Sequence, residues 1–510
     1  KIMSFVFFLL GLMPILWLIF ALIVLKWPTP RAAFGSLLLS ILLGMFIWKL
    51  NTIEALSATL EGCLMALWPI VLVIVAAIFT YNLTVRTGGM ETIKAMMTSV
   101  TSDKRLLVLI LAWCFGGFME GMAGFGTAIA IPAGMLVALG FEPLFACLVC
   151  LIANGVPTPF GSIGIPTVTL ANLLGLENTV LSSITTLQLA PFILLCPILI
   201  VMVTGGGIKG LKGVTGITLA SGISFVIPQF IVGKFVGAEL AVVVGSVCSL
   251  LVTILLSMKK KPDPAYQIEI TGKQKLDFNT CLKAWSPFIC IFVFLLLTSK
   301  LVAPINTFLA QFASQIVVYQ GANPGTITFS WINTPGVWIF ISALIGGLIQ
   351  KASFQDFKEV FIATLKQLKP TVITMMSVLG CAKVMGYSGM IASIASFVVA
   401  ITGPFYPIVA PWIGALGAFV TGSGTSSGVF FGAVQNSAAQ SLGSNPYWMV
   451  ALNSLGVAAG KMLSPQSIAI ALSAVGGQGQ DSKLLTKILP YGGLFLVLMS
   501  ILAYFGNMLF

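Results

Sequence analysis

The sequence contains no histidine, and only 8% of its 510 residues are Asp, Glu, Lys or Arg. Without imidazole, a Ser-His-Asp triad, a histidine proton relay and histidine ligation of haem are all excluded. Proton chemistry therefore depends on carboxylates or lysines. The one close cysteine pair, Cys147 and Cys150, lacks the further ligands of a metal site. We expect no metal, no cofactor and no enzyme activity, because no hydrolase or metal motif is present.

Long apolar runs dominate what remains, and 58% of the residues are hydrophobic. Runs of about 20 apolar residues, each long enough to cross about 30 Å of hydrocarbon, recur from end to end. This composition is typical of a polytopic membrane protein whose surroundings are a lipid bilayer. The net charge of +12 comes from basic loops and does not indicate nucleic-acid binding.

Continuous membrane spans are predicted from the length and apolar character of the runs. They cover residues 2–25, 32–50, 55–83, 180–204, 211–232, 236–257, 284–303, 336–350, 370–386 and 484–509. Most Lys and Arg residues, 20 of 26, fall in a subset of the connecting segments. These segments are 26–31, 86–105, 205–213, 258–283, 351–369 and 478–487. Placing them in the cytoplasm orients every span consistently.

Two apolar regions, 106–176 and 404–477, are broken repeatedly by Gly, Pro, Ser, Thr and Asn. Each is too long for one crossing, so each is predicted to hold a re-entrant hairpin followed by an interrupted crossing helix. The hairpins are 106–141, with the tip "GFMEGMAGFGTAIAIP", and 404–442, with the tip "TGSGTSSG". The broken helices are 143–176 and 446–477. This gives about twelve spans, two hairpins and both termini outside, in an all-α protein.

The two broken regions form a weak internal repeat with an offset of about 300 residues. Pro69 matches Pro370, and Gly121 matches Gly422. Segment 86–105 carries four cations whereas its counterpart, 387–403, carries none, so the copies are predicted to face opposite ways. Inverted repeats with discontinuous helices are the architecture of secondary transporters.

The expected organisation follows from this repeat. A transmembrane hairpin over 1–53 precedes a first inverted repeat over 54–204. Connecting helices with a cytoplasmic loop at 258–283 occupy 205–353, and a second inverted repeat occupies 354–510.

Four ionisable side chains are assigned to membrane depth, namely Glu61, Glu120, Lys383 and Lys461. Such groups are costly there and are functional candidates by default. Glu61 and Lys383 lie near span ends, where snorkelling to the interface is an alternative role. Glu120 and Lys461 each lie in an interrupted region, one per copy. The hypothesis is that Lys461 binds an anionic substrate while Glu120 carries a proton; the alternative is a permanent ion pair between them.

Glycines and small polar residues surround these two groups. Gly121, Gly124 and Gly126 are expected to unwind the first tip so that backbone N–H groups face a ligand, although close helix packing is an alternative. The polar candidates for substrate binding are Thr127, Asn154, Thr158, Ser162, Ser423, Thr425, Ser426, Ser427, Asn453, Ser464 and Gln466. Hydroxyls also satisfy broken-helix backbone, so part of this set has a structural alternative.

Three motifs, "EGMAGFGTAIAIPAGMLVALGFEPL", "IANGVPTPFGSIGIP" and "GKMLSPQSIAIALSAVG", resemble signatures of the bacterial L-lactate permease family. The resemblance implies proton-coupled symport of L-lactate and related 2-hydroxy monocarboxylates such as glycolate across the bacterial inner membrane. The family is similar to the wider ion transporter superfamily, which includes dimeric carriers that work as elevators, so an elevator mechanism and a homodimer are expected by analogy. In the second tip the family pattern reads Gly-Ser-Asp-Thr-Ser-Ser, whereas Gly424 replaces the acid here.

A sodium-coupled transporter of another small organic anion remains the alternative, with tip carbonyls and hydroxyls coordinating Na⁺. Uptake driven by a pH gradient without sodium would exclude it. A channel is not supported, because nothing resembles a repeated selectivity filter.

Overall fold

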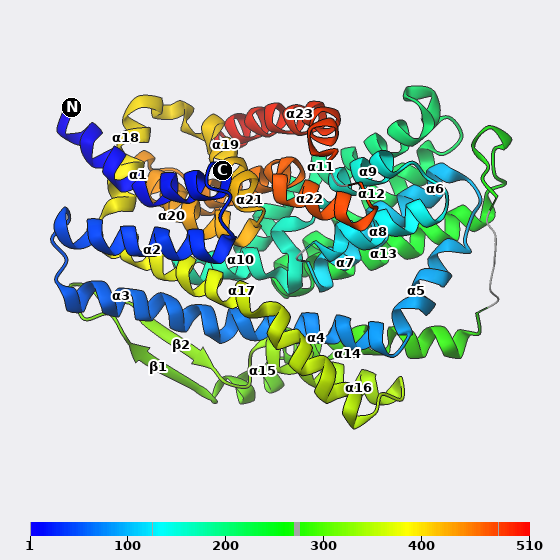
Figure 1. Cartoon of the computed structure of the whole chain (residues 1–510), viewed down its shortest axis with the longest axis horizontal. Coiled ribbons are helices and arrows are strands. Elements are labelled where there is room, and N and C mark those ends of the chain that lie inside the picture. The colour runs from blue at the N-terminus through cyan, green and yellow to red at the C-terminus, as the bar shows by residue number, and fades with distance from the viewer. Residues whose placement is uncertain (1, 125, 270–275, 478, 510) are drawn as a thin grey trace.

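The computed structural model describes residues 2–124, 126–269, 276–477 and 479–509. The chain is predominantly helical (Figure 1). Within the described residues, 11 helices are long and apolar enough to cross a membrane, and the count reaches 13 if each of two bent helix pairs is one span. The protein is therefore a multi-pass membrane protein, and the expected number of about twelve spans lies within this range.

The N-terminal helices are α1 (Ile2–Ile23), α2 (Thr29–Phe46), α3 (Thr52–Met65), α4 (Leu72–Arg86) and α5 (Gly89–Thr98). Residues Ala66–Val71 join α3 to α4 across a kink, where Trp68 has extended backbone (φ −137°, ψ 116°) and Pro69 has no N–H to donate to a helical ladder. The span predicted at 55–83 is therefore present but interrupted.

The first broken region begins with α6 (Lys104–Val108), a π-helical turn (Leu109–Phe115) and α7 (Gly116–Met122). It continues with α8 (Thr127–Ala138), α9 (Pro143–Gly155) and α10 (Gly161–Leu174). A bend of 60° separates α9 from the helical segment that ends α10. α8 folds back along α7. A Cβ at Gly116 in α7 would lie 3.5 Å from the Ala128 carbonyl in α8. The most apolar part of Lys104–Met122 is entirely buried inside the protein, where irregular backbone is tolerated.

The central helices are α11 (Asn178–Gly205), α12 (Thr215–Phe235), α13 (Ala238–Lys259), α14 (Phe278–Thr298), α15 (Ala303–Ala310) and α16 (Pro335–Ile349). Between α15 and α16, strands β1 (Ala313–Val317) and β2 (Thr326–Ser330) pair antiparallel, with Ala313 opposite Ser330. The expectation of an all-α protein is therefore wrong for this segment. Its β-branched and aromatic residues alternate with polar ones, which suits an extended ribbon.

The C-terminal helices are α17 (Phe354–Ser388), α18 (Met390–Thr402), α19 (Tyr406–Thr421), α20 (Gly424–Leu442), α21 (Pro446–Leu463), α22 (Pro465–Ala474) and α23 (Asp481–Asn507). The helix that contains the predicted span 370–386 begins already at Phe354, where Ser353 and Asp356 form a capping box. Most of the basic segment 351–369 is therefore helical rather than a loop. A bend of 46° separates α21 from α22.

The second hairpin, α19 and α20, is closed by the Ser427 hydroxyl, which donates to the Gly414 carbonyl at 2.8 Å. α21 packs so closely on α19 that a Cβ at Gly456 would come within 1.8 Å of the Pro411 carbonyl. Glycine also permits the contact between the two broken regions, since a Cβ at Gly155 would meet the Ala458 carbonyl at 2.3 Å. These contacts hold the two interrupted helices against each other.

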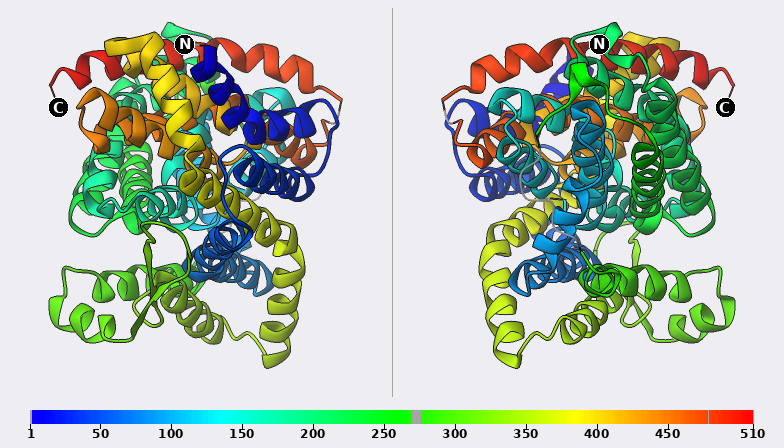
Figure 2. Two further views of the ribbon diagram at one scale, coloured as in Figure 1. Left: turned by 90° about the vertical axis from the view of Figure 1, so that its left-hand side faces the viewer. Right: turned by 90° about the vertical axis from the view of Figure 1, so that its right-hand side faces the viewer.

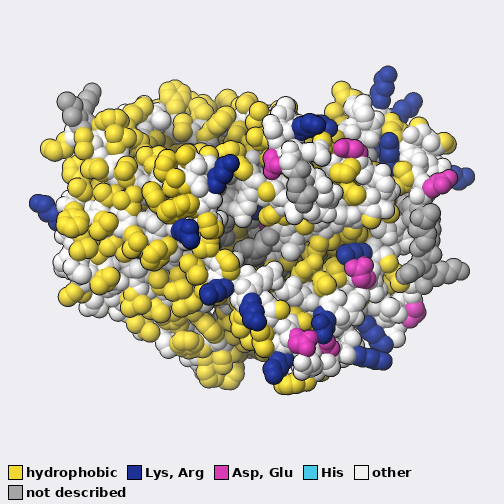
Figure 3. Space-filling model, in the orientation of Figure 1, with side chains coloured by type: hydrophobic (Ala, Val, Ile, Leu, Met, Phe, Trp, Pro, Cys, Tyr) yellow, Lys and Arg dark blue, Asp and Glu magenta, His cyan; other side chains and the backbone are white. Residues whose placement is uncertain are grey.

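The helices are distributed between two bodies in the views of Figure 2. The green and olive segments around α14, α15, α16 and the start of α17 lie in the lower body, below the hairpins and broken helices. On the face shown in Figure 3, charged side chains gather in the right-hand half, whereas hydrophobic side chains cover most of the left-hand part. A large apolar surface of this kind suits contact with lipid.

Candidate functional site

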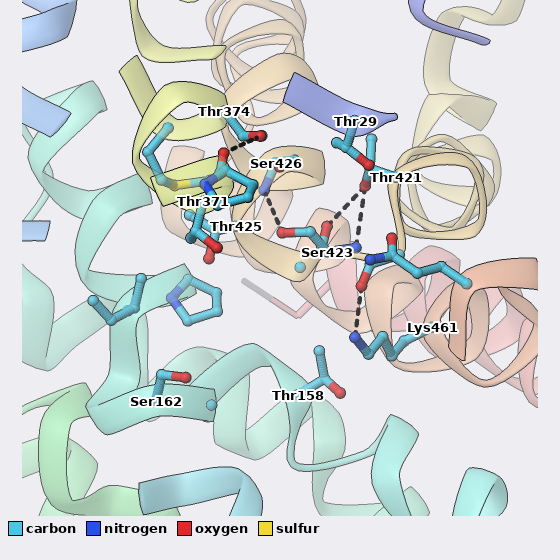
Figure 4. Close-up of a pocket in the computed structure, with 18 of the residues that line it drawn as sticks. Thr29, Thr158, Ser162, Thr371, Thr374, Thr421, Ser423, Thr425, Ser426 and Lys461 are labelled. Atoms are coloured by element: carbon cyan, nitrogen blue, oxygen red, sulfur yellow. Dashed lines mark hydrogen bonds between the residues drawn. The ribbon is translucent and has the colours of Figure 1, made fainter. Parts of the chain in front are cut away.

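A cavity of about 240 Å³ lies where the second hairpin tip meets the breaks of both interrupted helices. Its walls come from α2, α7, α10, α17, the α19–α20 tip, α21 and α22. The cavity is smaller than the roughly 300–1,000 Å³ typical of drug-sized ligands, so it suits a small metabolite. Figure 4 shows hydroxyl groups on opposite sides, with Thr158 and Ser162 facing Thr421, Ser423, Thr425 and Ser426.

Glu120 is placed on the cavity wall by the last turns of α7 and is only 4% exposed. Its Oε2 accepts a hydrogen bond from Asn154 Nδ2 at 2.7 Å. Among the described residues no hydrogen bond reaches Oε1, which lies against the backbone of Gly161. One carboxylate oxygen is therefore anchored, and the other is free to bind a proton or a ligand group.

Lys461 is 7% exposed and reaches the cavity from the last turn of α21. Its Nζ donates to the Gly422 carbonyl at 2.6 Å. An ammonium group has three donors, and this bond uses one. The helix carbonyls at the end of α21 and the tip carbonyl stabilise the cation where it is largely removed from water.

Glu120 and Lys461 line the same cavity, but no ion pair within 4.0 Å joins them among the described residues. Each is held by a different partner, Asn154 for the carboxylate and the Gly422 carbonyl for the ammonium. A permanent contact ion pair between the two, the alternative considered from the sequence, is therefore not what the structure shows. They are the charged groups that line this cavity in the described part of the chain, so their formal charges balance.

The second tip turns the N-terminus of α20 toward the cavity. Ser423 is the N-cap, and its Oγ accepts a hydrogen bond from the Ser426 N–H at 3.2 Å. The N–H groups of Gly424 and Thr425 belong to the first turn, where a helix offers no intrahelical acceptor. A side chain at Gly424 would meet Thr158 and Val457 at 3.1 Å, so the acid of the family pattern would crowd this wall. The tip thus presents a helix N-terminus to the cavity, with glycine at the position of the acid in the family pattern.

The first turn of α10 is left-handed over Ser162, Ile163 and Gly164, whose φ angles are 46°, 57° and 73°. Left-handed backbone is costly for residues other than glycine, so surrounding contacts must stabilise it. The Ser162 hydroxyl donates to the Ala123 carbonyl at 2.7 Å and ties the turn to the first hairpin tip. Gly161 allows the close approach of Glu120, because a Cβ there would lie 2.4 Å from Glu120 Oε1.

About half of the residues proposed from the sequence line the cavity. They are Glu120, Thr158, Ser162, Ser423, Thr425, Ser426, Lys461 and Gln466.

The glycines of the first tip do not line the cavity. Gly121 lies inside α7, where a Cβ would meet Val243 of α13 at 3.1 Å, so the unwinding expected there is absent and the packing alternative describes it. Gly124 and Gly126 have positive φ angles and form the turn between α7 and α8. Among the described residues, the glycines that line the cavity from a hairpin tip belong to the second tip, at Gly422 and Gly424.

The other proposed polar residues support the walls. Thr127 donates to the Gly124 carbonyl, and Asn154 positions Glu120. Ser427 closes the second hairpin, and Asn453 accepts a hydrogen bond from Gln435 at 3.4 Å. Ser464 is the N-cap residue of α22, where its buried Oγ has no partner among the described residues.

Several lining residues were not proposed from the sequence, including Thr29 of α2, Thr371 and Thr374 of α17, and Thr421. Thr421 is the first residue of the quoted tip motif, which is the signal that could have identified it. Thr29 lies in the predicted connecting segment 26–31, whereas Thr371 and Thr374 lie in the predicted span 370–386. Only the tertiary packing brings these three residues to the cavity.

Glu61 and Lys383 pair with each other away from this cavity. Lys383 Nζ lies 2.8 Å from Glu61 Oε1, and Tyr387 donates to the same oxygen at 2.9 Å. The pair is largely buried, so neither residue simply reaches the interface as the snorkelling alternative supposed.

The chain matches the model of the L-lactate permease family over residues 7–510. It is 46% identical to an L-lactate permease of Streptococcus iniae over 87% of this chain and 93% of that protein. It is 32% identical to an L-lactate permease of Escherichia coli over 97% of this chain and 94% of that protein. It is also 33% identical to the glycolate permease GlcA of Escherichia coli over 96% of this chain and 93% of that protein.

Two transporters of known structure align at low similarity. The YdaH transporter of Alcanivorax borkumensis gives a TM-score of 0.48 at 14% identity, over 88% of this chain and 86% of that one. MtrF of Neisseria gonorrhoeae gives 0.48 at 13% identity, over 89% and 83%. Likeness at this level carries no structural argument, whereas the sequence match spans nearly the whole chain. The chain belongs to the L-lactate permease family.

Proposed function

We propose that this protein imports L-lactate and related small 2-hydroxy monocarboxylates such as glycolate, together with protons, across the bacterial inner membrane. The observation that carries the proposal is a cavity of about 240 Å³ in which Lys461, Glu120 and the N-terminus of α20 meet. The names of the relatives, L-lactate permease and glycolate permease, support the substrate class.

The substrate carboxylate would bind at Lys461 and the free N–H groups of Gly424 and Thr425. A helix N-terminus and a lysine together favour an anion, and the charge-assisted hydrogen bonds offset the loss of its hydration. The 2-hydroxyl group would bind among the threonine and serine hydroxyls on the facing walls. The cavity has one lysine, which suits a monoanion better than a dianion.

Glu120 would carry the proton. With Lys461 charged and Glu120 ionised, adding a monoanion leaves the buried site with a net negative charge. Protonation of Glu120 restores neutrality, and a neutral loaded site crosses a low-dielectric environment at far lower electrostatic cost. Because no contact ion pair holds Lys461, the substrate would not have to displace Glu120 from it.

Alternating access would move this site between the two sides of the membrane. The bends of 60° and 46° in the two interrupted helices support the proposed inverted repeats, since both breaks reach one cavity. The elevator mechanism and the homodimer are proposed by analogy with the superfamily alone.

Counterflow in proteoliposomes tests the substrate class. Proteoliposomes that contain the purified protein and unlabelled L-lactate should accumulate labelled L-lactate from outside. External glycolate should reduce this accumulation, whereas external succinate should not. Equal competition by succinate, or no counterflow above protein-free liposomes, would contradict the proposal.

Sodium coupling is the second candidate, because hydroxyls and tip carbonyls are also ligands that Na⁺ accepts. Uptake driven by an imposed pH gradient in sodium-free buffer separates the two. Accumulation that requires a sodium gradient would replace proton coupling by sodium coupling.

A further inference from the structure

A second cavity, of about 440 Å³, shares no lining residue with the substrate cavity. It is bordered by the break between α3 and α4, by α10, by Glu239 at the start of α13 and by the segment from β2 to α16. α10 separates the two spaces, since residues 161–166 contribute to the substrate cavity and residues 168–172 to this one.

Charged side chains give the second cavity a formal charge of −1. They are Glu61, Glu239 and Lys383 among the described residues. Lys383 compensates Glu61 at 2.8 Å, whereas the side chain that donates to both oxygens of Glu239 is the neutral amide of Asn178, at 3.1 and 3.0 Å. One negative charge therefore lacks a cationic partner in contact.

Unpartnered polar atoms gather around the same cavity. Glu61, Thr169 and Thr334 line it and are 1%, 1% and 3% exposed. Glu61 Oε2 and the Oγ1 atoms of both threonines have no hydrogen-bond partner among the described residues. Buried polar atoms without partners destabilise the folded protein, so a ligand that satisfies them is favoured. An ionised carboxylate oxygen only accepts, which requires a donor or a positive charge from the ligand.

We propose that this second cavity binds a monovalent cation. An anion is disfavoured by the net negative charge, and the oxygen-rich lining of carboxylates and hydroxyls suits a hard cation. A divalent metal is disfavoured, because the described residues contain no group of three or more Asp, Glu or Cys placed to hold one. Trp68 also lines the cavity, so an organic ammonium ion could add a cation–π contact to the same electrostatic attraction.

Thermal unfolding of the purified full-length protein tests the proposal. NaCl, KCl and choline chloride are each titrated against N-methylglucamine chloride at constant ionic strength, which separates inorganic from quaternary ammonium ligands. A bound cation stabilises the folded state, so at least one salt should raise Tm saturably by about 2 °C. Identical Tm values in all four salts would overturn the proposal.

Variants locate the effect. Glu239→Gln and Thr169→Val should each abolish the cation-dependent rise in Tm. Glu61→Gln is avoided, because it would leave Lys383 buried without its partner. Glu91→Gln is the control, since this exposed acid on α5 pairs with Lys94 and does not line the cavity. A rise in Tm that persists in both cavity variants would place the cation elsewhere and overturn the proposal. Transport is not the readout, so the result is independent of the proposed function.

Discussion

Lys461 Nζ donates to the Gly422 carbonyl at 2.6 Å, which joins the last turn of α21 to the tip of the second hairpin. The tip that accepts this bond leads directly into α20, whose first turn contains the N–H groups of Gly424 and Thr425. A cation and a helix N-terminus converge from two separate elements. This arrangement is the basis for assigning the substrate carboxylate to this wall.

Lys461→Ala should weaken lactate binding by a factor of about 10 to 100, because a buried charge-assisted hydrogen bond contributes about 1.5–3 kcal/mol. Equilibrium binding of labelled L-lactate to the purified protein measures this loss. Lys483→Ala is the control, since Lys483 is exposed at the start of α23. Unchanged affinity in Lys461→Ala would remove Lys461 from the site.

Gly161→Ala should slow lactate uptake by about tenfold or more while the protein stays folded. The new Cβ would lie 2.4 Å from Glu120 Oε1, and overpacking of this kind typically costs about 1–3 kcal/mol unless the carboxylate moves. Gly493→Ala is the matched control, because its Cβ would meet nothing within 4 Å. Uptake at the wild-type rate in Gly161→Ala would show that the position of Glu120 is not critical.

The polar breaks of the sequence predicted the site better than they predicted its individual contacts. The motif at the second tip, the break at 157–166 and the Lys461 to Gln466 segment all reach the cavity. Clusters of Gly, Pro and hydroxyl residues in an apolar chain mark such places, because irregular backbone is tolerated there only around protein or water. The three glycines of the first tip carried the same signal yet serve turns and packing.

Arg105→Ala should lower the free energy of unfolding by about 3–5 kcal/mol, since it leaves the buried Asp103 without its bidentate partner. Arg105 is fully buried, donates to both carboxylate oxygens of Asp103 and to the Gly210 carbonyl, and stacks on Tyr266 at 3.8 Å. Thermal unfolding measures the loss. The double variant with Asp103→Ala should recover part of it, and a double variant as unstable as the sum of both single variants would contradict this account.

Other features lay beyond sequence reasoning because they depend on distant partners. Glu61 and Lys383 are 322 positions apart, and nothing local indicates that they pair at 2.8 Å. The first half of α17 carries several lysines and is predicted as a connecting segment, although the spacing of Ser353 and Asp356 indicates a helix N-terminus. The β1–β2 ribbon was not predicted, because it lies in a connection between spans and the prediction used only the length and apolar character of runs.

The proton-carrying role of Glu120 is tested most directly by sodium-free proteoliposomes under an imposed pH gradient. The wild-type protein should accumulate labelled L-lactate above its equilibrium level. Glu120→Gln, which keeps the shape of the side chain but cannot release a proton, should lose this accumulation and still exchange lactate in counterflow. Glu91→Gln should behave as wild type. Accumulation by Glu120→Gln at the wild-type level would contradict the account.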